Sequence, residues 1–371
     1  MARGKVNRIT YERFGILVSD FPAYKENGTL SGDLTRVQSM SYGFQHPALD
    51  VKSVGSDQLI TQGGESPIVR QPEVNCDISY IFSSGENEET IGFHLGSDGS
   101  ILKNFFEAPK TDDVNLILIA DQGCGHRDLN NVTDPQGFSD YNLIGFGNAF
   151  LTQYSYSAKV GSLPQCSISY ACSNLRFDEY NPESPPELPS VRLGVDNVFS
   201  EEKLFIDQES FNTHTENDLP SIMPGAIVVD ITKKAGRHGG AKIEDLEASI
   251  QSIDIDIPIS RQDIYGFGSN YVFDRKLKFP IIASVSIEMI LTNMNTGQIE
   301  SFFLEGSRYD MIVTHSERDS SGAIQSVNSF KIQEAQLKSQ NYNQSIGPNA
   351  SVSSDFTFGI SPSGGFSFYR E

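Results

Sequence analysis

The alternation of apolar and polar residues predicts a chain built mainly from β-strands. Residues 151–167 read LTQYSYSAKVGSLPQCS, which is a polar alternating run, a glycine and a second alternating run. Side chains that alternate in this way point to the two faces of a strand, and a glycine between two such runs marks a turn. This stretch is therefore predicted to be a strand, a turn and a strand.

The same pattern returns near the C-terminus, in residues 337–353 (LKSQNYNQSIGPNASVS). Two shorter matches support it: Val37-Gln-Ser against Ile250-Gln-Ser, and a pair of phenylalanines at 105–106 against a pair at 302–303. The three matches keep the same order with drifting offsets, as expected when loops change length and strands do not. The step of 186 positions carries Leu151 onto Leu337, Tyr156 onto Tyr342 and Gly161 onto Gly347. We therefore expect a tandem duplication of one mainly β domain.

The duplication predicts a first domain at 1–177, a proline-rich acidic linker and extended arm at 178–223, and a second domain at 224–371. The boundary lies at DEYNPESPPELPS, because proline removes a backbone donor and fixes φ. The predicted fold class is mainly β, with two tandem sandwich or barrel domains, long loops and one short helix each. Those helices are placed at 101–107, capped by Ser100, and at 297–304.

Individual segments follow from the same patterns. Strands are predicted at 13–19, 37–44, 74–82, 91–95, 114–119, 250–259 and 281–290. Turns or loops are predicted at 50–70, 83–89, 121–147 and 263–278, and a glycine- and serine-rich aromatic tail at 356–369.

Composition narrows the class of protein. The net charge of -20 argues against direct binding of nucleic acid, which needs Lys and Arg to displace phosphate counterions. No apolar run approaches the ~20 residues that span a bilayer, so membrane insertion and a secretory signal are not expected. Cys76, Cys124, Cys166 and Cys172 lack paired metal spacing, which favours buried free thiols made in a reducing cytoplasm. Cys166 and Cys172 are expected on one face of one strand.

Candidate chemistry is sparse. Asp254 and Asp256 alternate along a strand, roughly 6.5–7 Å apart, but the first copy has Ser41 and Gly43 in their places. Catalysis also needs a concave, partly dry site, so a solvated face is the expected role. The cluster of Asp121, Cys124, His126 and Asp128 lies in one glycine loop without the spaced ligand pairs of a zinc site. No enzymatic activity, cofactor or metal is expected.

The order of elements, closed twice by a strand–glycine–strand (YSYSAKVGSLPQCSIS and QNYNQSIGPNASVSS), resembles the tail tube proteins of tailed bacteriophages. The resemblance covers roughly residues 10–177 and 224–360, and the simplest members of that family have one such domain per chain. It implies a structural virion protein of the tail, made in the host bacterial cytoplasm. Its rings would stack into a conduit through which DNA is ejected without specific binding, in contact with other tail proteins.

A two-domain chain implies that three copies supply six domains to a pseudo-hexameric ring, with a hexamer as the alternative. Tyr156 and Tyr342 are the expected contacts between subunits, because each is a lone large aromatic residue in a polar edge strand. Packing inside the chain is the alternative for both. Asp254 and Asp256 are expected to face the lumen, with an outward solvated face as the alternative.

Other functions stay open at the level of sequence. Another ring-forming tail component, such as a baseplate hub, a distal tail ring or a tube-end protein, fits the same pattern. A carbohydrate-binding β module is weakened by the absence of tryptophan. A hydrolase on a β scaffold lacks a nucleophile, a metal cluster and a catalytic dyad.

Overall fold

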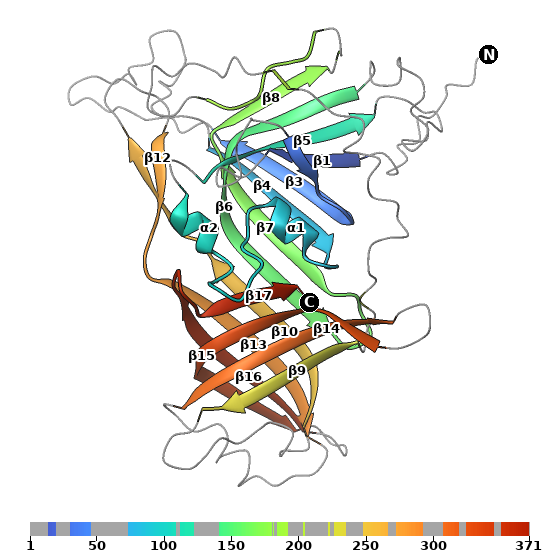
Figure 1. Ribbon diagram of the computed structural model, residues 1–371, viewed down its shortest axis with the longest axis vertical. Helices are drawn as coiled ribbons and strands as arrows, with labels where there is room; N and C mark the ends of the chain where they lie inside the picture. Colours follow the sequence, from blue (N-terminus) through green and yellow to red (C-terminus); the bar gives the residue numbers. More distant parts are fainter. Residues whose placement is uncertain are drawn as a thin grey trace, which may run out of the picture.

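The computed structural model shows a mainly β protein with two short helices in the described part of the chain (Figure 1). The described residues are 14–19, 30–45, 73–108, 112–121, 141–179, 181, 184–191, 203–204, 222, 226–234, 248–265, 272–291, 307–318, 324–344 and 350–370. No helix among them is long and apolar enough to cross a membrane.

We call β1 to β8 the first half and β9 to β17 the second half. The first half contains β1 (Phe14–Ser19), β2 (Leu30–Asp33), β3 (Val37–Gln45), β4 (Glu73–Ile81), α1 (Glu86–Thr90), α2 (Lys103–Glu107), β5 (Val114–Asp121), β6 (Tyr141–Lys159), β7 (Gln165–Cys172) and β8 (Asn174–Glu179). The second half contains β9 (Ile227–Lys233), β10 (Ala248–Pro258), β11 (Arg261–Tyr265), β12 (Val272–Leu277), β13 (Ile281–Leu291), β14 (Arg308–Arg318), β15 (Ile324–Gln344), β16 (Ala350–Ile360) and β17 (Phe366–Arg370).

Fifteen strands belong to one sheet, and β11 and β12 form a separate hairpin. Within the large sheet, eight antiparallel strands run in the order β3-β4-β7-β6-β10-β13-β16-β15, and we call them the central sheet. The pair β6–β10 joins the two halves, which lie one above the other with α1 and α2 beside their junction (Figure 1).

The two halves use the same pattern of strand pairing. In the first half β3 pairs with β4, β4 with β7, β7 with β6, and β6 also with β5 and β8. In the second half β10 pairs with β13, β13 with β16, β16 with β15, and β15 also with β14 and β17. These strands occur in the same order along the chain, so β3 to β8 correspond in turn to β10 and β13 to β17.

Irregularities in register recur at matching positions. The β3–β4 pairing shifts between Val37 and Ser39, and the β10–β13 pairing shifts between Ile250 and Ser252. These residues are 213 positions apart, the step that aligns the two segments in sequence. The step of 186 likewise relates the shift at Leu151/Gln153 in β6 to the shift at Leu337/Ser339 in β15.

The core follows the predicted alternation. In and just after β10, every second residue is at most 2% exposed: Ile253, Ile255, Ile257 and Ile259. Cys166 and Cys172 are buried on one face of β7, and Cys76 is buried in β4, all as free thiols. The prediction of buried free thiols is thus confirmed for these three cysteines, and Cys124 lies outside the described residues.

The segment after β4 differs from the sequence prediction of a turn at 83–89 and a strand at 91–95. Helix α1 occupies Glu86–Thr90, and Ile91 and Phe93 are buried in the irregular chain that follows it. Helix α2 begins at Lys103, and no side chain caps it. The predicted cap at Ser100 is wrong because the helix begins later, with Leu102 at the N-cap position. The backbone amides of residues 100 and 101 donate to Pro362 and Phe366 in the second half.

Two predicted loops are partly strand. β6 begins at Tyr141, inside the predicted loop 121–147, because Leu143 and Phe146 are buried in the core. The predicted aromatic tail forms the end of β16 and β17, where Phe366 and Phe368 are fully buried. In the second half, the predicted loop 263–278 contains most of the β11–β12 hairpin. The helix predicted at 297–304 and the loop at 50–70 lie outside the described residues.

Candidate assembly interface

The central sheet has one apolar face, which packs into the core, and one polar face. The polar face carries six carboxylates, at Glu73, Asp77, Asp254, Asp256, Glu288 and Asp355. The same stretches of strand contain two lysines, Lys159 and Lys338. The face is otherwise rich in serine and asparagine, so its net charge is negative along both halves.

One pair of a serine and an aspartate recurs at the same place in each half, with the two residues exchanged between the strands. Asp77 on β4 accepts a 2.6 Å hydrogen bond from the hydroxyl of Ser169 on β7. On the counterpart strands the residues are exchanged, and Asp355 on β16 accepts a 2.6 Å hydrogen bond from Ser286 on β13. Hydrogen bonds from Ser286 and Ser339 lower the pKa of Asp355, so this carboxylate stays charged at neutral pH.

Asp254 and Asp256 lie on the polar face of β10, opposite Ser157 and Ser155 of β6. Asp254 is exposed, and Asp256 is half-buried and accepts a 2.7 Å hydrogen bond from the side chain of Gln153. The strand therefore presents both carboxylates at the junction of the two halves. Whether this face borders a lumen stays a prediction.

The central sheet ends at β3 on one side and at the C-terminal part of β15 on the other. Among the strands that the structure describes, β3 pairs with β4 alone, and residues 337–344 of β15 pair with β16 alone. Such edges offer backbone donors and acceptors to a further strand. Large apolar side chains gather there as well: Tyr42 and Phe44 on β3 are 41% and 55% exposed, and Tyr342 on β15 is 47% exposed.

Tyr42 and Phe44 were not identified from the sequence. The signal was present, because a step of 213 places them on Ile255 and Ile257, two buried residues of β10.

Tyr156 lies inside the chain, at the contact between the halves. It is 1% exposed, and its hydroxyl is hydrogen-bonded to Nε2 of His315 on β14 at 2.6 Å. Its ring packs edge-on against Phe82 of the first half and Phe330 of the second. Tyr156 thus has the internal packing role that the sequence left open, and contact with another subunit stays a prediction for Tyr342.

The most deeply buried carboxylate is also internal. Glu88 of α1 is 1% exposed and accepts hydrogen bonds from the hydroxyls of Tyr80 and Tyr154, at 2.7 and 3.2 Å. Burial raises the pKa of Glu88, and the hydrogen bonds from the tyrosines act in the opposite direction. All three residues are closed off from solvent, so this group anchors α1 to the sheet and is no place for a substrate.

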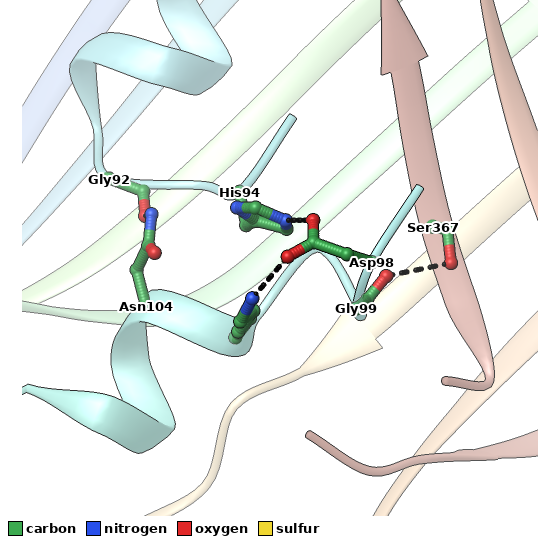
Figure 2. Close-up of polar contacts among 7 residues, drawn as sticks. Gly92, His94, Asp98, Gly99, Asn104 and Ser367 are labelled. Carbon is green, nitrogen blue, oxygen red and sulfur yellow. Dashed lines mark hydrogen bonds and ion pairs between the residues drawn. The ribbon is translucent and has the colours of Figure 1, made fainter. Parts of the chain in front are cut away.

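The chain between α1 and α2 holds the first half to β17. Ser367 donates a 2.9 Å hydrogen bond to the carbonyl of Gly99, and the amide of Ile101 donates to the carbonyl of Phe366 at 2.8 Å (Figure 2 shows the first). On the outer side, Lys103 and His94 both bond to Asp98 and lower its pKa to about 2. These contacts fix the turn between His94 and Lys103. In the described chain, no group of three or more His, Cys, Asp or Glu residues could hold a metal ion.

No family model matches the chain, and no curated protein matches it. Among solved structures it is similar to one titled "Crystal structure of Hcp protein". The identity is 10% and the TM-score 0.20, and the match covers 39% of this chain and 98% of the other. At that level the similarity bears on neither function nor assembly.

Proposed function

We propose that this chain is a structural subunit of a bacteriophage tail tube. Copies would join side by side into a ring, rings would stack, and the polar face of the central sheet would line a channel for DNA. The observation that carries the proposal is a central sheet of eight strands with an acidic polar face, whose two edge strands pair on one side only within the described part of the chain. It is also the function that the resemblance of the sequence implies.

The two edges belong to different strands, so a contact between them is heterologous. Contacts of that kind either close into rings or propagate as filaments, and stacked rings do both. An exposed strand edge that is not covered tends to recruit another strand, which gives main-chain hydrogen bonds across the contact. The exposed aromatic side chains of β3 would then be covered by the neighbouring copy.

The charge of the polar face fits a conduit better than a binding surface. Duplex DNA carries one negative charge per ~1.7 Å of its axis, so a basic lining would hold it. A lining with six carboxylates and two lysines per chain repels the duplex over roughly 8 Å at physiological salt. DNA would then stay centred and mobile.

We further propose that the chain arose by duplication, with domains at 1–177 and 224–371 joined by 178–223. The repeated strand pairing and the repeated register shifts support this. Three chains would then place six similar domains around one pseudo-hexameric ring, and a ring of six chains is the alternative. The protein would lie in the tail of the virion, beside other tail proteins, with no enzymatic role.

Native mass spectrometry and negative-stain microscopy of the purified chain test the proposal. We expect closed oligomers of three chains and long stacked tubes. Single rings that never stack would assign the chain to another ring-forming tail component, such as a baseplate hub or a tube-end protein. Monomers at every salt and protein concentration would refute a ring-forming role altogether.

A further inference from the structure

The contact between the two halves of one chain, where β6 pairs with β10, indicates how two chains would meet. We infer that a second copy of this chain binds with the end of its β15 along β3, in the register that β6 and β10 use within the chain. The inference rests on the proposed ring assembly, and it adds the partner surface and the residues that meet.

The register follows from the strand correspondences. Within the chain, Tyr156 of β6 lies opposite Ile255 of β10. The counterpart of Tyr156 is Tyr342, 186 positions later, and the counterpart of Ile255 is Tyr42, 213 positions earlier. The equivalent contact between copies therefore sets Tyr42 of one chain opposite Tyr342 of the next. It also sets Phe44 opposite Gln340.

Burial differs between the halves at matching positions, and the side chains of the first half are the more exposed. In the second half the residues are at most 1% exposed: Ile255, Ile257, Phe330 and Phe368. Their first-half counterparts are Tyr42 at 41%, Phe44 at 55%, Ile144, which is partly buried, and Phe177 at 60%. Ile144 corresponds to Phe330 and Phe177 to Phe368, because Ile144 pairs with Phe177 between β6 and β8 as Phe330 pairs with Phe368 between β15 and β17.

Phe330 and Phe368 are buried because the first half covers them. The ring of Phe82 lies 5.3 Å from that of Phe330 and 6.0 Å from that of Phe368. Tyr156 packs on Phe330 at 5.0 Å. At Gly85, a Cβ would lie only 2.3 Å from the ring of Phe368, so the backbone there rests directly on this residue.

The first half has a similar apolar surface at its own end, and Tyr342, the counterpart of Tyr156, lies on the second half at the end of β15. The register taken from β6 and β10 gives one more argument for a second copy as the partner. It places Ser41 opposite Asn343 and Gly43 opposite Asn341, all on the polar face. The polar face then continues from chain to chain without bringing like charges together.

Cysteine pairs test the register in the full chain, in a Cys124→Ser background because the other three cysteines are buried. The in-register variant is Tyr42→Cys with Tyr342→Cys. We expect mild oxidation to give a ladder of covalent multimers on a non-reducing gel, which each single variant lacks. The matched control is Tyr42→Cys with Asn341→Cys, whose second cysteine points to the opposite face, so we expect the ladder to be lost.

A charge on the covered surface gives an independent readout. Phe177→Asp lies on an exposed side chain, so the monomer should keep its circular dichroism spectrum and melting temperature while assembly is lost. The control, Val228→Asp, is at a position that is 52% exposed on β9, a strand outside the central sheet, and it should assemble normally.

The outcomes separate this inference from the proposed function. Rings that form while only the out-of-register cysteines cross-link, or rings that tolerate Phe177→Asp, would overturn the register and leave ring formation standing. Absence of any oligomer would overturn both.

Discussion

Two residues with positive φ show that the halves match even in the backbone conformation of single residues. Asn148 and Glu334 have φ of 47° and 58°, a region that residues other than glycine seldom adopt. They lie 186 positions apart, where β6 and β15 pass from one set of partners to another. The amide of Asn148 donates to the side chain of Asn115 at 3.2 Å, and that of Glu334 to Asp310 at 2.9 Å. One side-chain oxygen on the neighbouring strand therefore fixes the bend in both halves.

Asn115→Ala should destabilise the protein, because it leaves the buried amide of Asn148 without its acceptor. We expect a loss of about 1–3 kcal/mol in the free energy of unfolding, measured with urea. Asp310→Ala is the matched control. Its loss should be smaller because Glu334 is exposed and water can replace the acceptor. Equal losses in the two variants would contradict the role of the buried bond.

Glu88 gives a prediction about pH dependence, since its burial raises its pKa. Between its unfolded pKa of about 4.3 and the raised value, the folded protein binds more protons than the unfolded chain. The contribution of Glu88 to stability therefore falls as pH rises through that window. Glu88→Gln keeps an acceptor for Tyr80 and Tyr154 and does not titrate, so its stability relative to wild type should increase with pH. Parallel stability curves for the two proteins would refute this, and Glu89→Gln, on the exposed side of α1, serves as control.

Between strands, the contact of β6 with β14 depends on a neutral imidazole. Burial lowers the pKa of His315 to about 3, while its cross-strand partner Asn328 acts in the opposite direction. The unfolded chain takes up a proton below about pH 6.5 and the folded chain does not. This group therefore costs stability as pH falls from about 6.5 towards 3, and above 6.5 it costs nothing.

His315→Gln should flatten the acid side of the stability profile between about pH 6.5 and 3. The quantity to compare is the difference in stability between the variant and wild type at each pH, because carboxylates elsewhere in the protein titrate in the same range. Differential scanning calorimetry across the window provides it. A difference that does not change with pH would show that His315 is not the group that senses acid at this contact.

Strands were the part of the fold that sequence could predict. The isoleucines at 253, 255, 257 and 259 alternate with polar residues, and β10 buries all four. Helix α1 was missed because its residues ENEET carry no apolar stripe, and the hydrogen bonds that buried Glu88 accepts come from tyrosines on two strands, β4 and β6. The exposure of Tyr42 could not be predicted either, because it depends on which strand lies beside β3, a property of the whole sheet and not of the segment.

In the assembled tube, the charge of the polar face should control how fast DNA passes. Replacing Asp254 and Asp256 by lysine changes the face from six carboxylates and two lysines to four of each. Neither residue lies on β3 or β15, so rings should still form. The lining would then be neutral instead of negative, so DNA would lose the repulsion that keeps it mobile, and its release should slow, more at low ionic strength, where charges are less screened.

The matched control is Glu89→Lys with Glu107→Lys, the same change in charge at exposed positions on α1 and α2, off the central sheet. Particles assembled with each variant would be compared for the rate of DNA release at two salt concentrations. We expect slow, salt-dependent release only for the Asp254 and Asp256 variant. If both variants slow release equally, total charge and not the polar face is responsible. If neither does, the two aspartates do not line the channel, and the polar face must lie elsewhere in the assembly.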